Sequence, residues 1–274
     1  MPMELFKNRT STAAYGATFL NTIVSFWALY FLPLYFQSTQ LVSPTRSGVM
    51  LLPFSIIYAL SALVGGGITT KLGRYRIIHF VGHAIMTIGI GTFTIFDRNT
   101  HLAIIVVLEV IFAFGIGVVT PNLLTAIQAA LPESLNAAST GTFAFVRSVG
   151  TIWGVSIPAA IFNNRFDQLL VELSDEKAVA ALARGGAYES ASSEFLDSFP
   201  AQVRDVIISI YERSLMRVWQ IGIVFAGLGF IVIFFEKNLE LRKEKETQEV
   251  RLEDRPNVCT ASSQDPIIEQ RGSD

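Results

Sequence analysis

Six long apolar runs constrain this chain more than any other feature of its sequence. They cover residues 12–36, 47–70, 77–96, 102–125, 138–162 and 214–235. A helix needs about 20 apolar residues to cross the hydrocarbon core of a membrane, and each run has that length. Because lipid cannot satisfy backbone N–H and C=O groups, each run is predicted to be a helix. The sequence therefore predicts an all-α membrane protein with six transmembrane helices.

Charged residues are scarce, and the chain has no excess of positive charge. They make up 16% of the chain, against about 25% in a soluble domain, and the net charge is −2. Nucleic acid is therefore not an expected partner. The single cysteine, Cys259, and the three histidines show no metal-ligand spacing, so neither a metal nor a cofactor is expected. The motifs of a catalytic nucleophile or a phosphate-binding loop are also absent, and we do not expect an enzyme.

The basic residues between the runs predict the orientation of the chain. Lys7 and Arg9 precede the first run, Lys71, Arg74 and Arg76 lie between the second and third, and Lys237, Arg242, Lys243 and Lys245 follow the sixth. Short loops rich in Lys and Arg stay in the cytoplasm. Both termini are therefore predicted to be cytoplasmic, and the long segment 163–213 is predicted to lie outside.

This topology divides the chain into five segments. They are a cytoplasmic N-terminal segment (1–11), helices one to five (12–162), an extracytoplasmic segment (163–213), helix six (214–235) and a charged, largely disordered cytoplasmic tail (236–274). Within the outer segment, residues 171–183 predict a short amphipathic helix. A second helix is expected to start near Pro200, because proline suits the first helical position.

Two charged residues fall deep inside predicted spans. Glu109 lies roughly 10 Å below the outer end of the fourth span and Arg147 roughly 13 Å from the inner end of the fifth, at about 1.5 Å per residue. A charge at such depth needs a partner or a wet cavity. Three hypotheses remain open: a structural Glu109–Arg147 ion pair, a protonatable or substrate-facing Glu109, and a position at the lipid edge.

Smaller polar and aromatic features predict how the helices meet. Thr18, Asn21, Thr22 and Ser25 form a polar stripe that either lines a cavity or makes interhelical hydrogen bonds. His79 and His83, one turn apart, are interpreted as interfacial rather than as metal or proton-relay sites. Trp27, Trp153 and Trp219 are expected at the outer interface, at least in part. Small residues at regular spacing, such as Gly65 and Gly154, predict closely packed helices.

Several motifs follow one another in a characteristic order. They are FLPLYFQ (31–37), SGVMLLPFSI (47–56), GGGITTKLGRYR (65–76), FGIGVVTPN (114–122) and STGTFAFVRSVGTIWGVSIPAAIFNNRF (139–166). In this order and spacing the chain resembles the C-terminal half of a major facilitator superfamily transporter, and more narrowly the fungal fourteen-helix drug:proton antiporter branch. The resemblance covers residues 5–236. It implies two inverted three-helix repeats, which form half of that fold.

The resemblance also implies where a substrate would pass. In the family the first and fourth helices line the central cavity, the second and fifth face the other half, and the third and sixth face lipid. The expected pathway residues are Asn21, Ser25, Glu109, Asn122 and Arg147. A single six-helix bundle is expected to expose the face containing Asn21, Glu109 and Arg147 to lipid.

One family motif is altered in this chain. The cytoplasmic hairpin motif G-x-L-x-D-R-x-G-R aligns at Gly66, Ile68, Thr70, Lys71, Gly73 and Arg74, with Arg76 completing the basic loop. Thr70 stands where the motif has its aspartate. The charge relay ascribed to the motif therefore cannot be carried over. An anchoring turn, with Gly73 permitting the tight bend, is expected instead.

The functional hypothesis is a partial secondary transporter. The resemblance implies proton-coupled efflux of drugs, toxins or small metabolites, at the plasma membrane or alternatively the vacuolar membrane. The expected partners are membrane lipid, a small-molecule substrate, protons, and either a missing N-terminal half or a second copy. The alternative is a non-transporting module that pairs with or regulates a full-length relative. The chain is accordingly expected to be a fragment, a mis-predicted gene product or a degenerate paralogue.

Overall fold

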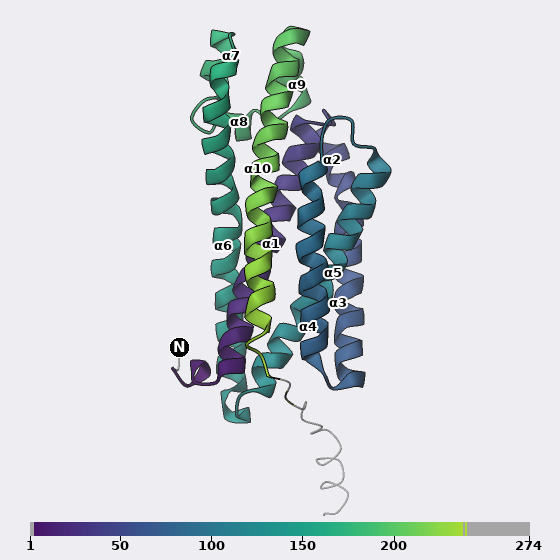
Figure 1. Ribbon diagram of the computed structural model, residues 1–274, viewed down its shortest axis with the longest axis vertical. Helices are drawn as coiled ribbons and strands as arrows, with labels where there is room; N and C mark the ends of the chain where they lie inside the picture. Colours follow the sequence, from purple (N-terminus) through teal and green to yellow (C-terminus); the bar gives the residue numbers. More distant parts are fainter. Residues whose placement is uncertain (1–2, 238, 240–274) are drawn as a thin grey trace, which may run out of the picture. The chain divides into compact units, whose positions relative to one another are not determined.

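The computed structural model describes residues 3–237 and 239, which form a bundle of long helices (Figure 1). The long helices are α1 (Arg9–Ser38), α3 (Leu52–Leu72), α4 (Tyr75–Thr92), α5 (Leu102–Ala129), α6 (Asn136–Leu169) and α10 (Ala201–Ile233). Six helical segments of the described residues are long and apolar enough to cross a membrane. Because the described residues contain no strand, the predicted fold class, an all-α protein with six transmembrane helices, is confirmed.

Shorter elements connect the long helices. They are η1 (Met3–Phe6), α2 (Pro44–Met50), η2 (Phe93–Ile95), η3 (Glu133–Leu135), η4 (Leu170–Glu172), α7 (Glu176–Leu182), α8 (Gly186–Glu189) and α9 (Ser193–Asp197). α7 lies within the amphipathic segment 171–183, and α10 begins directly after Pro200. The predicted tail, residues 236–274, lies outside the described residues except for 236, 237 and 239.

Local sequence explains where these helices begin and end. The Asn8 side chain accepts a hydrogen bond from the Thr10 backbone N–H and so caps the start of α1. α3 ends at Gly73, whose φ of 63° lies in the left-handed region that glycine adopts without strain. The chain can therefore turn from α3 into α4 within a few residues, as the sequence predicted for this hairpin.

The helix contacts are similar in the two halves of the bundle, which are α1 with α6 and α10, and α5 with α3 and α4. α1 packs along α6 and α10, while α5 packs along α3 and α4; α4 also meets α10, and α1 meets α5. Exchanging α1 with α5, α3 with α6 and α4 with α10 leaves this set of most extensive contacts unchanged. Such an exchange is the relation expected between two inverted three-helix repeats.

Glycine sets the distance between the helices in both halves. A Cβ atom on Gly65 of α3 would lie 2.5 Å from the Val118 carbonyl oxygen of α5. In the other half, a Cβ on Gly154 of α6 would lie 2.7 Å from the Ile23 carbonyl oxygen of α1. Only a residue without a side chain fits at these points. The predicted small-residue interfaces therefore exist, and they occur in helix pairs that the repeat exchange relates.

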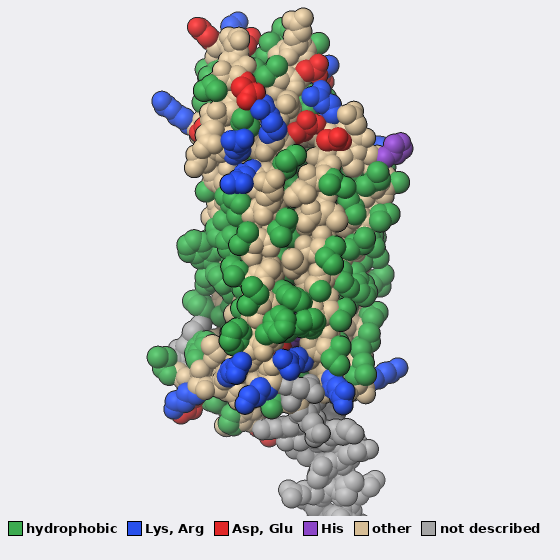
Figure 2. All heavy atoms as spheres, in the orientation of Figure 1, with side chains coloured by type: hydrophobic (Ala, Val, Ile, Leu, Met, Phe, Trp, Pro, Cys, Tyr) green, Lys and Arg blue, Asp and Glu red, His purple; other side chains and the backbone are tan. Residues whose placement is uncertain are grey.

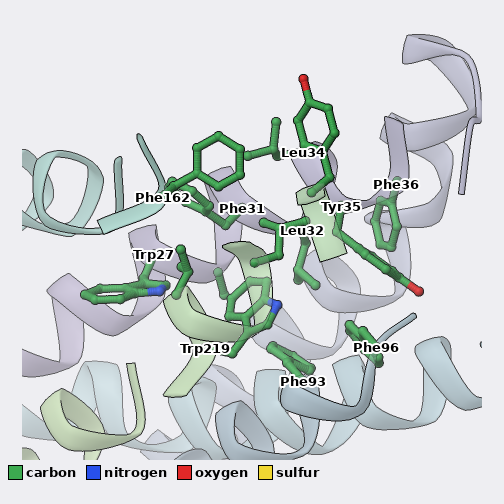
Figure 3. Close-up of a cluster of buried hydrophobic side chains, with 14 of the residues drawn as sticks. Trp27, Phe31, Leu32, Leu34, Tyr35, Phe36, Phe93, Phe96, Phe162 and Trp219 are labelled. Carbon is green, nitrogen blue, oxygen red and sulfur yellow. The ribbon is translucent and has the colours of Figure 1, made fainter. Parts of the chain in front are cut away.

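An aromatic core joins α1 to α10 and to the end of α4 (Figure 3). The Phe93 and Trp219 rings meet edge to face with their centroids 5.2 Å apart, and Trp27 is fully buried nearby. Trp27 and Trp219, which were expected at the outer interface, both point into the bundle interior. Trp153, by contrast, is half exposed.

Candidate functional site

The polar stripe of α1 meets α5 at one point. Asn21 is buried and donates a hydrogen bond from Nδ2 to Thr120 Oγ1 at 3.2 Å. Ser25 is half-buried, and its hydroxyl donates to the Asn21 carbonyl of the same helix at 2.7 Å. Thr18 and Thr22 likewise donate to carbonyls one turn earlier in α1. The stripe therefore contributes one interhelical hydrogen bond, at Asn21, and sequence reasoning missed Thr120 as its partner.

Glu109 is a fully buried carboxyl group on α5. Neither carboxylate oxygen has a hydrogen-bond partner among the described residues, and none of their ion pairs includes it. Glu109 precedes Thr120 by 11 residues (120 − 109), which is about three helical turns, so both residues lie on the same side of α5. Its buried neighbours along α5, Ile105, Phe112 and Ala113, are apolar.

Arg147 does not pair with Glu109. Its side chain is exposed on α6, with the guanidinium carbon 5.7 Å from the centre of the Phe143 ring, a cation–π geometry. The hypothesis of a structural Glu109–Arg147 pair is therefore wrong. The physical reason is the arrangement of the helices: α5 and α6 each pack extensively on α1 and only slightly on each other.

The bundle also encloses the face that was expected to be open to lipid. Asn21 and Glu109 are buried, because α1 and α5 pack on each other and on the surrounding helices, and only Arg147 of the three is exposed. Asn122 is buried too, and its Nδ2 donates to the Val118 carbonyl of its own helix at 2.6 Å. Of the expected pathway residues, the structure joins Asn21 and Ser25 by a hydrogen bond, and among the described residues neither is hydrogen-bonded to Glu109, Asn122 or Arg147.

The basic hairpin between α3 and α4 forms a turn held by local bonds. The exposed Thr70 hydroxyl donates to the Gly66 carbonyl of α3 at 2.9 Å. Arg76 donates from Nη2 to the Phe234 carbonyl near the end of α10 at 3.5 Å. Lys71 and Arg74 form no ion pair with the described residues. These contacts fit an anchoring turn rather than a charge relay.

A second buried polar cluster lies between α4 and the residues that follow α10. His79 Nδ1 lies 2.8 Å from Glu236 Oε2, and both side chains are fully buried. His83 Nδ1 lies 2.9 Å from the His79 carbonyl oxygen, and the Tyr75 hydroxyl donates to the Lys237 carbonyl at 2.6 Å. Neither histidine is exposed at the surface of the bundle, because His79 lies against Glu236 and His83 lies beside Gly229 of α10. The one-turn spacing of the histidines was the available signal.

The surface of the bundle separates charge from apolar side chains. On the face shown in Figure 2, charged side chains gather towards the two ends, and the surface between them is largely apolar. Several long helices carry exposed apolar side chains, such as Leu63 of α3, Ile88 of α4 and Ile152 of α6. A surface of this kind suits a hydrocarbon environment.

Comparison with known proteins decides the family. Residues 2–155, more than half of the chain, match the Major Facilitator Superfamily. The chain belongs to the Major Facilitator Superfamily. With six apolar helices long enough to span a membrane, this Major Facilitator Superfamily chain is an integral, multi-pass membrane protein.

The curated relatives are fungal efflux proteins. The chain is 70% identical to the MFS-type efflux transporter pyiT of Pyricularia grisea, over 100% of this chain and 47% of that protein. It is 47% identical to the MFS-type efflux transporter phmH of Phaeosphaeria nodorum, over 90% of this chain and 43% of that protein. It is 38% identical to the efflux pump FUS6 of Gibberella moniliformis, over 98% of this chain and 48% of that protein. The chain thus spans about half the length of these relatives.

Proposed function

We propose that this chain forms the C-terminal six-helix part of an efflux transporter that exports drugs, toxins or small metabolites in exchange for protons. The relatives named as efflux transporters support the direction of transport. Transporters of this superfamily bind substrate near the membrane midplane, between two six-helix halves that rock against each other. The proposal places Asn21, Ser25 and Thr120 beside the pathway and assigns proton binding to Glu109.

The observation that carries the proposal is the unpartnered carboxyl group of Glu109. An ionised carboxylate in an apolar interior is costly unless a cation or hydrogen-bond donor stabilises it, and the described residues provide neither. Glu109 therefore holds a proton while it is enclosed. It would release that proton only when rearrangement of α1 and α5 admits water, which is the behaviour that exchange with a substrate requires.

A partner would cover the apolar faces of α3 and α6. Leu63 of α3 is 75% exposed and Ile152 of α6 is 64% exposed, and these are the helices that face the other half in the family. We assign these faces to a second six-helix unit, either an N-terminal half or a second copy of the chain. The alternative, a non-transporting module that binds a full-length relative, would use the same faces.

Transport by reconstituted protein tests the proposal. The purified full chain is crosslinked, separated into monomer and dimer, and placed in liposomes with an imposed pH gradient and a lipophilic cationic dye. We expect gradient-driven dye movement in the dimer and its loss in Glu109→Gln, while the exposed Glu133→Gln control keeps it. Equal transport by wild type and Glu109→Gln would overturn the role of Glu109. An inactive dimer would rule out a second copy of the chain as the other half, and would leave an N-terminal half or the non-transporting alternative.

Sidedness is tested by cysteine labelling on a Cys259→Ser background. Glu189→Cys probes the outer segment and Glu133→Cys the connection between α5 and α6; both positions are exposed. An impermeant reagent applied to whole cells should label only Glu189→Cys, since the predicted topology puts this position outside. The reverse pattern would invert the topology. We place the transporter in the plasma membrane, and labelling that requires permeabilisation at both positions would indicate an internal membrane instead.

A further inference from the structure

A cavity of about 570 Å³ opens between α6 and α10, apart from the residues assigned to transport. Arg165 of α6 and Arg213 and Arg217 of α10 line it. Figure 2 shows basic side chains, with acidic ones among them, over the upper parts of these two helices. None of the pathway residues lines the cavity, so it is a separate site.

The arginines of the cavity are not fully neutralised. Arg213 donates to both carboxylate oxygens of Glu172, at 2.8 and 2.5 Å. Arg165 and Arg217 have no carboxylate within 4.0 Å among the described residues. With the Arg213–Glu172 pair balanced, two positive charges remain at the cavity.

Two glutamines orient these free arginines. Arg165 Nη1 donates to Gln168 Oε1 at 3.2 Å, and Arg217 Nη1 donates to Gln220 Oε1 at 3.3 Å. Each guanidinium has five N–H groups, so most of its donors stay available. Because each glutamine follows its arginine by three residues in a helix, the two side chains share a face. The cavity therefore presents two positioned guanidinium groups to a ligand.

The other part of the cavity is apolar. Ile161, Met216 and Ile221 line it alongside the arginines. In the predicted topology Arg165 follows the end of the fifth span at 162, and Arg217 lies just inside the start of the sixth at 214. The arginines are thus at headgroup level, where long basic side chains commonly reside. A ligand that fills the site needs an anionic group joined to an apolar chain.

We propose that this cavity binds the phosphate group of a membrane phospholipid, with an acyl chain along Ile161, Met216 and Ile221. Guanidinium groups match phosphate oxygens with paired N–H donors, which selects phosphate over other headgroup atoms. Free phosphate carries the same chemistry without the acyl chain, so the two sources can be separated by experiment. The inference does not rest on transport, since it uses no residue of the proposed pathway.

The test is lipid titration of the purified full chain in detergent, followed by native mass spectrometry. The probes are phosphatidylglycerol, diacylglycerol (which lacks the phosphate) and inorganic phosphate. The variants are Arg165→Gln/Arg217→Gln, the charge-retaining Arg165→Lys/Arg217→Lys, and Arg46→Gln, an exposed outer arginine of α2 that serves as the matched control. Circular dichroism confirms that each variant keeps its helices.

We expect phosphatidylglycerol to bind the wild type and Arg46→Gln alike, and the double glutamine variant at least tenfold more weakly. The double lysine variant should fall between them, because lysine keeps the charge but loses the planar pair of donors. Diacylglycerol binding as tight as phosphatidylglycerol would overturn the phosphate assignment, as would unchanged binding by the folded glutamine variant. Arginine-dependent binding of inorganic phosphate with no preference for the lipid would overturn the acyl-chain part.

Discussion

Two buried carboxyl groups of the bundle have opposite surroundings. Glu236, which follows α10, is fully buried against α4, and its Oε2 lies 2.8 Å from His79 Nδ1. Glu109, within α5, is equally inaccessible but has no partner among the described residues. A paired carboxylate in an apolar interior holds helices together, whereas an unpaired one is tolerated only in its neutral form. On this contrast we propose a structural role for Glu236 and proton binding for Glu109.

The largest expected effect comes from breaking the paired site. Glu236→Ala leaves His79 Nδ1 buried without a partner and should lower the free energy of unfolding by about 3 kcal/mol. Thermal or denaturant unfolding in detergent measures the change. Glu133→Ala, at an exposed position, is the control and should change stability by less than about 0.5 kcal/mol. Equal effects of the two substitutions would mean that the His79–Glu236 contact does not stabilise the fold.

A smaller loss should follow from removing the hydrogen bond between α1 and α5. Thr120→Val keeps the shape of the side chain but removes the acceptor of Asn21 Nδ2, and should cost about 1 kcal/mol. Thr125→Val is the matched control on α5, because the Thr125 hydroxyl bonds only to its own helix. Unfolding of both variants under the same conditions gives the comparison. A larger loss of stability in Thr125→Val than in Thr120→Val would mean that the Asn21–Thr120 hydrogen bond does not stabilise the packing of α1 on α5.

The smallest effect is expected between Glu109 and Arg147. Because these residues do not touch, the stability changes of Glu109→Gln and Arg147→Gln should add, with a coupling below about 0.5 kcal/mol. A double-mutant cycle on unfolding in detergent provides the value. A coupling energy of several times that size would support the Glu109–Arg147 ion pair after all. Glu109 would then be a paired carboxylate, as Glu236 is.

The features that depend only on position along a single helix could be predicted from the sequence. The length of the apolar runs predicted the six spans, Gly73 predicted the tight turn between α3 and α4, and Pro200 predicted the start of α10. These features depend on neighbouring residues and on the thickness of a membrane, both of which can be worked out from a single chain.

The sequence could not predict which side of each helix faces which neighbour. The predicted depths of Glu109 and Arg147 are compatible, but their helices pack extensively on α1 and only slightly on each other, so depth alone predicted the wrong partner. His79 and Glu236 are 157 residues apart, and their contact depends on how the residues after α10 fold over α4. For the same reason the sequence did not show that Trp27 and Trp219 point into the bundle.

We propose above that Glu109 holds a proton inside the bundle. Infrared spectroscopy of the purified full chain at neutral pH, comparing wild type with Glu109→Gln and Glu133→Gln, tests it most directly. We predict a carbonyl band of a protonated carboxylic acid in the wild type and in Glu133→Gln, and its absence in Glu109→Gln. A wild-type spectrum in which Glu109→Gln removes only ionised carboxylate bands would contradict the account, because it would show a charged, stabilised Glu109.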